Sequence, residues 1–467
     1  MIQRAREDFA EPVPGAMLAS ACREHRKALD RLKSLRDSYA NRRQIMERTR
    51  PNNLPNARLA HGFARYISTM ASGYLIGKPV AYSAPDEAQG PALEALQDAY
   101  TRTAIDSVDA ELAKDASVYG KGVELVYADE NAQPRSVSMD PISAFVVYDT
   151  SAQARPMFGV ITQDVIRMDG TKDGLAVTVA TPSAMWIYRV QSEEQLIGAE
   201  PVEVRPHFFG DIPIVEYWNE EDEIGDFEQV NGLIDAYDTL QSDRINDKTQ
   251  FVNALLVLTG ADMEPERDEE TGDVTRSPAQ QIREDGILSL PEGATAEYLA
   301  RALSENDVQV LRNSIASDIH KFSMVPDLTD EHFAGNSSGV AMRYKLLEFE
   351  QLMQIKERWF REALRERMRL YAAFLARKGS PVLDVDNVRM QFTRSLPVNE
   401  LETSQMIRNL EGMVPPEQLL AQLPFVDDPA AAAEQMEEQR AQESVREAQM
   451  YNLRPEQPPE EDEEAEE

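Results

Sequence analysis

The sequence predicts an α+β fold that is mainly helical, and three observations indicate this. Apolar residues recur at helical spacing over long stretches in both halves of the chain. Short runs rich in β-branched and aromatic residues, separated by Gly, Pro, Asp and Asn, fill the middle from about 121 to 218. The chain has 467 residues, of which 42% are hydrophobic, so it can build more than one core.

The composition is strongly acidic. Asp and Glu number 82 against 48 Lys and Arg, which gives a formal net charge of −34. Such a chain repels polyanions on average, which disfavours a tight DNA-binding function. The single cysteine, Cys22, excludes a disulfide framework and lies in a charged helical stretch. The opening residues lack the apolar core of a signal peptide, and no run reaches the ~18 apolar residues of a membrane span, so we expect no membrane partner.

The first part of the chain is predicted to be helical. Residues 15–48 form an Arg- and Lys-rich helix, which either contacts an acidic partner or DNA or presents a solvated face. Residues 57–77 and 91–118 are two further helices, the first of them apolar on more than one face. An antiparallel meander follows from about 121 to 218, with strands in GVELVYAD, RSVSMD, AFVVYDT, MFGVITQD, LAVTVAT, MWIYRV and PIVEYWN.

The second half alternates long helices with shorter segments. A helix is predicted over 226–258, with acidic side chains outward at Asp226, Glu228, Asp235, Asp238, Asp243 and Asp247. A second helix covers 304–322, and the charged segment between the two contains short strands. A helix over 338–377 is about 60 Å long at ~1.5 Å per residue. One more strand, in VRMQFTRSL, precedes helices from about 399 to 450, and the acidic tail 455–467 is predicted to be disordered.

Residues 335–339 fit the pattern G-x-S-x-G, which in hydrolases marks a nucleophilic serine, here Ser337. That chemistry needs a strand before the serine and a base, yet no strand pattern precedes it and no histidine follows it. Ser337 or Ser338 instead suits the N-cap of the long helix, where a hydroxyl accepts a backbone N–H. No other pattern indicates a catalytic, cofactor or metal site. A structural protein is favoured; a serine hydrolase and a scaffold that binds no DNA are the alternatives.

Six stretches, in this order, together resemble the portal proteins, or head–tail connectors, of tailed bacteriophages, especially of the siphophage type. Each is weak alone, but their order across about 380 residues makes the resemblance specific. The stretches are NNLPNARLAHGFARYISTMASGYLIGKPVAYS at 52–83, MDPISAFVVYDT at 139–150, PHFFGDIPIVEYWNEED at 206–222, AYDTLQSDRINDKTQFVNALLVLTGADM at 236–263, NSSGVAMRYKLLEFE at 336–350 and MVPPEQLLAQLPFVDDP at 413–429.

The resemblance implies a ring, usually of twelve subunits, at one vertex of the capsid, through which double-stranded DNA passes without sequence specificity. It implies as partners the terminase large subunit, scaffolding and major capsid proteins, and head–tail adaptor proteins, with the chain in the virion and, during assembly, in the host cytoplasm. By analogy the chain divides into a wing at 1–225, a stem helix at 226–258, a clip at 259–303, a second stem helix at 304–322, a tunnel loop at 323–338, a long wing helix and strand at 339–398, crown helices at 399–454 and the tail at 455–467.

The resemblance also implies candidate site residues. The stem candidates that face the bore are Asp235, Asp238, Asp243 and Asp247, and an acidic wall of this kind would not capture phosphates. The tunnel-loop candidates are Asp327, Asp330, Glu331, His332 and Asn336. The clip candidates for docking basic partners are Glu264, Glu266, Asp268, Glu269 and Glu270.

Overall fold

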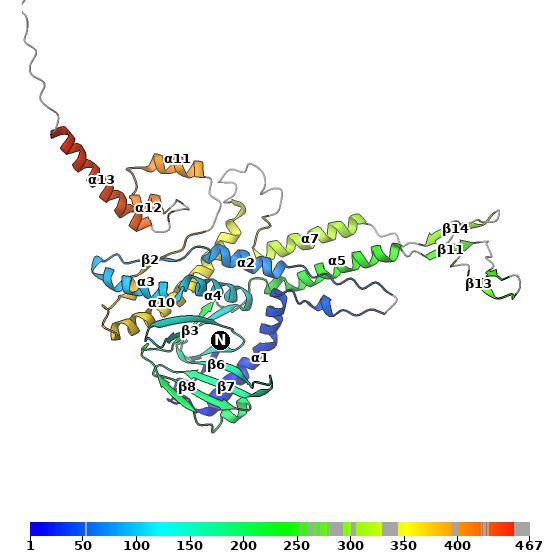
Figure 1. Cartoon of the computed structure of the whole chain (residues 1–467), viewed down its shortest axis with the longest axis horizontal. Helices are drawn as coiled ribbons and strands as arrows, with labels where there is room; N and C mark the ends of the chain where they lie inside the picture. Colours follow the sequence, from blue (N-terminus) through cyan, green and yellow to red (C-terminus); the bar gives the residue numbers. More distant parts are fainter. Residues whose placement is uncertain are drawn as a thin grey trace, which may run out of the picture. The chain divides into compact units, whose positions relative to one another are not determined.

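The computed structural model describes residues 1–51, 54–252, 255–259, 265–268, 271–277, 280, 293–299, 305–328, 344–394, 400–421, 423, 426 and 429–452 (Figure 1). The chain divides into two compact units. The first, unit 1, comprises Met1–Arg36, Arg65–Gln229 and Ser323–Glu467. The second, unit 2, comprises Asp37–Ala64 and Val230–Phe322. Helices and strands are both well represented, so the prediction of a mainly helical α+β fold is confirmed.

Unit 1 contains a six-stranded sheet. Its order is β1 (Ile2–Arg4), β5 (Ala144–Asp149), β6 (Pro156–Ile166), β7 (Lys172–Ala180), β8 (Ala184–Val190) and β9 (Glu203–Pro206). The strands from β5 to β9 form the expected antiparallel meander, whereas β1 pairs with β5 in parallel. The remaining strands of the region form a separate sheet of β10 (Ile214–Trp218), β3 (Lys121–Ala128) and β4 (Pro134–Met139), so a single meander is wrong.

Both faces of the six-stranded sheet are covered. Alternate residues such as Phe145, Phe158 and Val177 pack against Leu18 and Cys22 of helix α1 (Gly15–Tyr39). On the other face Ala144, Val146 and Ile161 pack against residues of β3 and β10. This arrangement follows from the period-2 alternation of a strand, which sends successive side chains to opposite faces.

The helices of unit 1 surround these sheets. They include α3 (Gly90–Thr103), α4 (Ile105–Tyr119) and the long α10 (Leu347–Arg377), which packs on β10 and α3. The short strands β2 (Ala81–Ser83) and β15 (Arg389–Gln391) pair with each other. The C-terminal part has α11 (Glu400–Leu410), α12 (Pro416–Leu420) and α13 (Pro429–Asn452), while the tail 455–467 lies outside the described residues.

The α10 helix begins later than predicted. Its N-cap is Leu346, which makes no side-chain cap hydrogen bond, and not a serine near 338. Ser337 and Ser338, the predicted cap residues, lie outside the described residues, so their capping role stays a prediction. The end of the helix at Arg377 agrees with the prediction.

Unit 2 contains α5 (Asn231–Val252) and α7 (Glu305–Ser323), which run side by side (Figure 1). The second stem helix was predicted at nearly these bounds. The first was predicted too long, because it starts after the 3-10 turn Glu228–Val230 and because Leu255–Thr259 is a strand, β11, paired with β14 (Thr295–Leu299). A second hairpin pairs β12 (Glu266–Arg267) with β13 (Val274–Arg276).

Two further helices are shorter than predicted. Helix α1 ends at Tyr39, near Asn41, whose φ of 60° lies in the left-handed region that asparagine tolerates. A 3-10 turn, Gln44–Glu47, follows it. Helix α2 (Phe63–Ile76) starts six positions later than expected, because residues 54–61 belong to no helix or strand. We call residues 54–61 the strap.

Candidate functional site on helix α5

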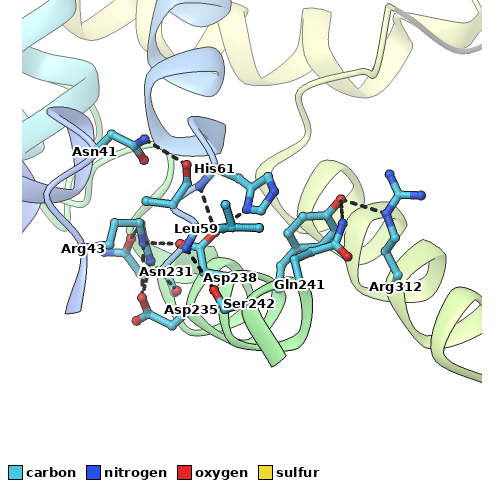
Figure 2. Close-up of polar contacts among 12 residues, drawn as sticks. Asn41, Arg43, Leu59, His61, Asn231, Asp235, Asp238, Gln241, Ser242 and Arg312 are labelled. Carbon is cyan, nitrogen blue, oxygen red and sulfur yellow. Dashed lines mark hydrogen bonds and ion pairs between the residues drawn. The ribbon is translucent and has the colours of Figure 1, made fainter. Parts of the chain in front are cut away.

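The N-terminal half of α5 is bound by a buried arginine. Arg43 lies immediately before the turn Gln44–Glu47, and only 2% of its side chain is exposed. Its Nη2 donates to Asp235 Oδ1 at 2.7 Å and to the Asn231 carbonyl at 3.0 Å, and its Nε lies 3.2 Å from Asp238 Oδ2 (Figure 2). The planar guanidinium thus contacts two turns of the helix and provides a positive charge for two carboxylates.

Asp238 is fully buried, so the expectation that it points outward is wrong. Its Oδ1 accepts the backbone N–H of His61 at 2.8 Å and lies 2.7 Å from the His61 ring Nδ1 (Figure 2). Burial raises the pKa of this carboxyl, while the bonds from His61 and the charge of Arg43 oppose that rise. A buried carboxylate needs such partners, and their presence explains why an acidic residue sits on the covered face.

The strap is bonded to α5 as a ladder. The backbone N–H groups of Ala57, Leu59 and His61 donate to Asn246 Oδ1 at 2.6 Å, Ser242 Oγ at 3.0 Å and Asp238 Oδ1 at 2.8 Å. Every second strap residue therefore meets every fourth helix residue, in opposite chain directions. Two extended residues rise ~6.6 Å and four helical residues rise ~6.0 Å, so the two repeats match over three bonds.

A third acidic residue of α5 binds two arginines. Asp243 Oδ1 accepts from Arg48 Nη1 at 2.7 Å and from Arg50 Nη2 at 2.6 Å. Arg48 also donates to the carbonyl of Ala57 at 2.7 Å, which ties the arginines to the strap. Asp247, one turn further on, has no hydrogen-bond or ion-pair partner among the residues that the structure describes. The arginines thus offset most of the negative charge predicted for this helix.

Tyr237 connects α5 to its neighbours in unit 2. Its hydroxyl accepts from Arg312 Nε of α7 at 3.0 Å and from Gln241 Nε2 at 3.3 Å. Its ring packs edge-on against His61 and Phe63, with centroid separations of 4.8 and 5.1 Å. The same side chain thus contacts α7, the strap and the start of α2.

The remaining sequence-predicted site residues are only partly covered by the structure. Asp327 is described, while Asp330, Glu331, His332 and Asn336 lie outside the described residues. In the clip candidate, the Glu266 carboxylate accepts from Arg276 at 3.3 Å, and Asp268 accepts the Thr271 backbone N–H at 2.9 Å. The other three clip candidates, Glu264, Glu269 and Glu270, lie outside the described residues. A role of these residues in a tunnel loop or in docking stays a prediction.

Elsewhere in the part of the chain that the structure describes, no candidate reaction centre is present. Cys22 is buried in the core, which raises the pKa of its thiol to about 12. Within the described ranges, no group of three or more His, Cys, Asp or Glu side chains is arranged to hold a metal ion. Nor is any helix there long and apolar enough to cross a membrane. A surface pocket of about 480 Å³ between α4 and β4 contains Asp115, whose pKa burial raises to about 6.

No local sequence pattern indicates four residues of this site: Arg43, His61, Ser242 and Asn246. Their contacts join positions far apart in the chain, and periodicity within one helix cannot identify such partners. One signal was available, because the basic segment containing Arg43, Arg48 and Arg50 is complementary in charge to α5. This basic segment was predicted either to contact an acidic partner or DNA or to present a solvated face. In the structure its arginines Arg43, Arg48 and Arg50 contact acidic residues of the chain's own helix α5.

Comparisons with known proteins agree with one another. The family model described as "Phage portal protein, SPP1 Gp6-like" matches residues 20–446. The portal protein of Bacillus phage SPP1 is 22% identical over 415 residues, which cover 85% of this chain and 78% of that protein. The portal protein of Clostridium phage phiCD119 is 21% identical over 420 residues, which cover 86% and 89%.

Two solved structures from gene transfer agent particles are also similar. A chain in the neck of an empty particle is 12% identical, with a TM-score of 0.44, over 78% of this chain and 90% of that chain. A chain in the virion of the native particle is 11% identical, with a TM-score of 0.44, over 84% and 93%.

Proposed function

The chain belongs to the family of SPP1 Gp6-like phage portal proteins and is a structural component of the phage virion; from this premise we propose that its copies form a ring at the portal vertex that conducts double-stranded DNA. DNA enters through the ring during packaging and leaves through it during ejection. Twelve upright helices, each about 10 Å across, would enclose a bore of roughly 28 Å, which admits a duplex.

The observation that best supports DNA conduction is that the arginines around α5 are already paired with carboxylates. Arg43 is buried, and Arg48 and Arg50 share the carboxylate of Asp243. Tight DNA binding requires Lys and Arg side chains that replace the counterions of phosphates. These three cations already have carboxylate partners, so they are not available for that exchange. A duplex next to α5 would therefore meet few phosphate contacts and could slide.

The exposed positions of α5 are consistent with this function. In its first three turns they are small and uncharged: Gly232, Ala236 and Thr239. In our proposal Asp235 and Asp247 add a weak negative field at the bore, while Asp243 is neutralised by Arg48 and Arg50 and Asp238 is excluded from the wall by its burial. Weak repulsion without capture suits a channel through which a polyanion moves in both directions.

The partners belong to the same proposal. The clip, with Glu266 and Asp268 on its β12–β13 hairpin, presents exposed carboxylates to basic surfaces of the terminase large subunit and, later, of head–tail adaptor proteins. The wing contacts scaffolding and major capsid proteins. In the same proposal Asp327 lies in the tunnel loop, four residues after the end of α7.

Negative-stain electron microscopy of the purified protein, together with its native mass, tests the ring. We expect rings with a central hole and a mass near twelve times the 52.5 kDa of one chain. A monomer that persists with its scaffolding protein present would contradict the proposal.

DNA conduction is tested by adding charge to the exposed face of α5. The double variant Ala236→Lys/Thr239→Lys should assemble normally but package DNA several-fold more slowly, because free cations would bind phosphates. The matched variant Ala236→Gln/Thr239→Gln should package at the normal rate. Equal packaging by both variants would place the DNA path away from this face.

A further inference from the structure

The ladder between the strap and α5 repeats, and a repeating ladder has neighbouring registers. Three strap N–H groups, from Ala57, Leu59 and His61, use three acceptors spaced one helical turn apart. Since the two repeats match, a displacement of the strap by two residues brings each N–H opposite the next acceptor. The residues at the two ends of the ladder decide which displacement keeps the bonds.

A displacement toward the C-terminal end of α5 keeps all three acceptors occupied. His61 would donate to Ser242, and Leu59 would donate to Asn246. Asp238 would then face the N–H of Phe63, the first residue of α2, which now donates to the His61 carbonyl at 2.9 Å. A carboxylate at a helix N-terminus is a favourable partner for such a group.

The opposite displacement breaks the ladder at both ends. Asn246 would face Pro55, which has no N–H to donate. The N–H of His61 would face Ile234, a fully buried apolar side chain that accepts no hydrogen bond. One acceptor and one donor would lose their partners, whereas the first displacement takes one donor, the Ala57 N–H, beyond the last acceptor and leaves no acceptor unpaired; an unsatisfied buried group is costly.

The arginine contacts show the same asymmetry independently. Arg48 and Arg50 bind Asp243. One turn toward the C-terminal end lies Asp247, whose carboxylate has no partner within the described part of the chain. One turn in the other direction lies Thr239, which is neutral. A second charged position is therefore present on the side where the backbone ladder also continues.

From these two ladders we propose that the strap and α5 form a two-position register device, in which the strap, together with Arg48 and Arg50, shifts by one helical turn along α5 in one direction only, while Arg43 keeps its contacts with Asp235 and Asp238. The shift is about 6 Å along the helix axis. The device is a property of this chain by itself. The device would let α5 and the strap move lengthwise against each other as DNA passes. This use of the device rests on the proposed function.

Disulfide trapping in the full-length protein tests the device. In a Cys22→Ala background, Leu59→Cys with Ser242→Cys reports the observed register, because the Leu59 nitrogen lies 3.0 Å from Ser242 Oγ. Leu59→Cys with Asn246→Cys reports the proposed shift, and Ala57→Cys with Ser242→Cys reports the opposite shift. The last two pairs are each one turn out of register, so simple flexibility would cross-link them equally.

We expect the proposed-shift pair to cross-link about tenfold faster than the opposite-shift pair. Asp247→Asn should slow the proposed-shift pair several-fold and leave the observed-register pair unchanged, whereas Asp318→Asn on α7, which makes the same charge change, should affect neither. Equal rates for the two shifted pairs, or cross-linking of the observed pair alone, would overturn the device. The measurement uses purified protein without DNA, so a failure of the conduit proposal would appear separately, in the ring and packaging assays.

Discussion

In the six-stranded sheet of unit 1, the side chains that face α1 are apolar and buried, whereas the buried face of α5 in unit 2 carries Asp238, Ser242 and Asn246 next to apolar residues. Both regions exclude water, but they do so with different chemistry. The sheet is stabilised by non-directional burial of Val, Ile and Phe side chains. The α5 helix is bonded through named donors and acceptors at fixed intervals.

This difference matters for how each region responds to displacement. An apolar core tolerates many small adjustments, but each one must keep its packing density. A hydrogen-bond ladder has discrete positions, and intermediate positions leave buried polar groups unpaired. The sheet region is therefore suited to a fixed scaffold, and the α5 region to a part that holds one position or another.

The largest effect is expected in the sheet. Phe158→Ala removes a fully buried ring between the sheet and α1, and should lower the free energy of unfolding by about 3–5 kcal/mol. Chemical denaturation measures the loss. Val204→Ala on β9, where the side chain is exposed, is the matched control and should change stability little. A loss below about 1 kcal/mol for Phe158→Ala would show that this core is not the main source of stability.

Next comes the buried charge of the α5 region. Arg43→Ala leaves the carboxylate of Asp238 buried without its cation and should cost about 3 kcal/mol. Adding Asp238→Asn should restore part of that loss, because the neutral amide needs no counter-charge. A double-mutant cycle gives the coupling of the two side chains. Additive losses would mean that Arg43 acts only through Asp235 and Asn231.

The sequence predicted the sheet region better than the α5 region, and there is a physical reason for the difference. The strands of the meander carry their own signal, since alternation and β-branched residues are local properties. The register of Asp238 with Arg43 and His61 depends on contacts between distant segments. Helical periodicity alone placed Asp238 among the outward acids, because aspartate is seldom buried unless it is paired.

The boundaries of α5 show the same limit. The run LLVL at 255–258 falls within the predicted helix, because a short apolar run has no period that separates helix from strand. Its pairing with β14 decides the outcome. The start of α2 was also set by distant contacts, since residues 57–61 are held by side chains of α5.

A polar group in unit 1 gives a prediction of opposite sign. Burial raises the pKa of Asp115 from 3.8 to about 6, so the folded state favours the protonated acid. Wild-type stability should then decline as pH rises from about 4 to about 6 and stay lowered above that. Asp115→Asn avoids this loss and should be more stable than wild type by about 1–2 kcal/mol at pH 7. Thermal unfolding at pH 4 and pH 7 measures the difference, and a variant advantage that is equal at both pH values would contradict it.

The smallest effect should come from one bond of the ladder. Ser242→Ala removes the acceptor of the Leu59 N–H and should cost about 1 kcal/mol, because that donor is left without its partner. Thr239→Ala changes an exposed residue three positions before Ser242; this variant is the control and should cost much less stability. The sharper readout is local, since hydrogen exchange at Leu59 should accelerate by about tenfold while exchange at Val179 in the sheet stays unchanged. Acceleration at both amides would mean that the strap opens only with global unfolding, and that its bonds to α5 do not form an independent, discrete contact.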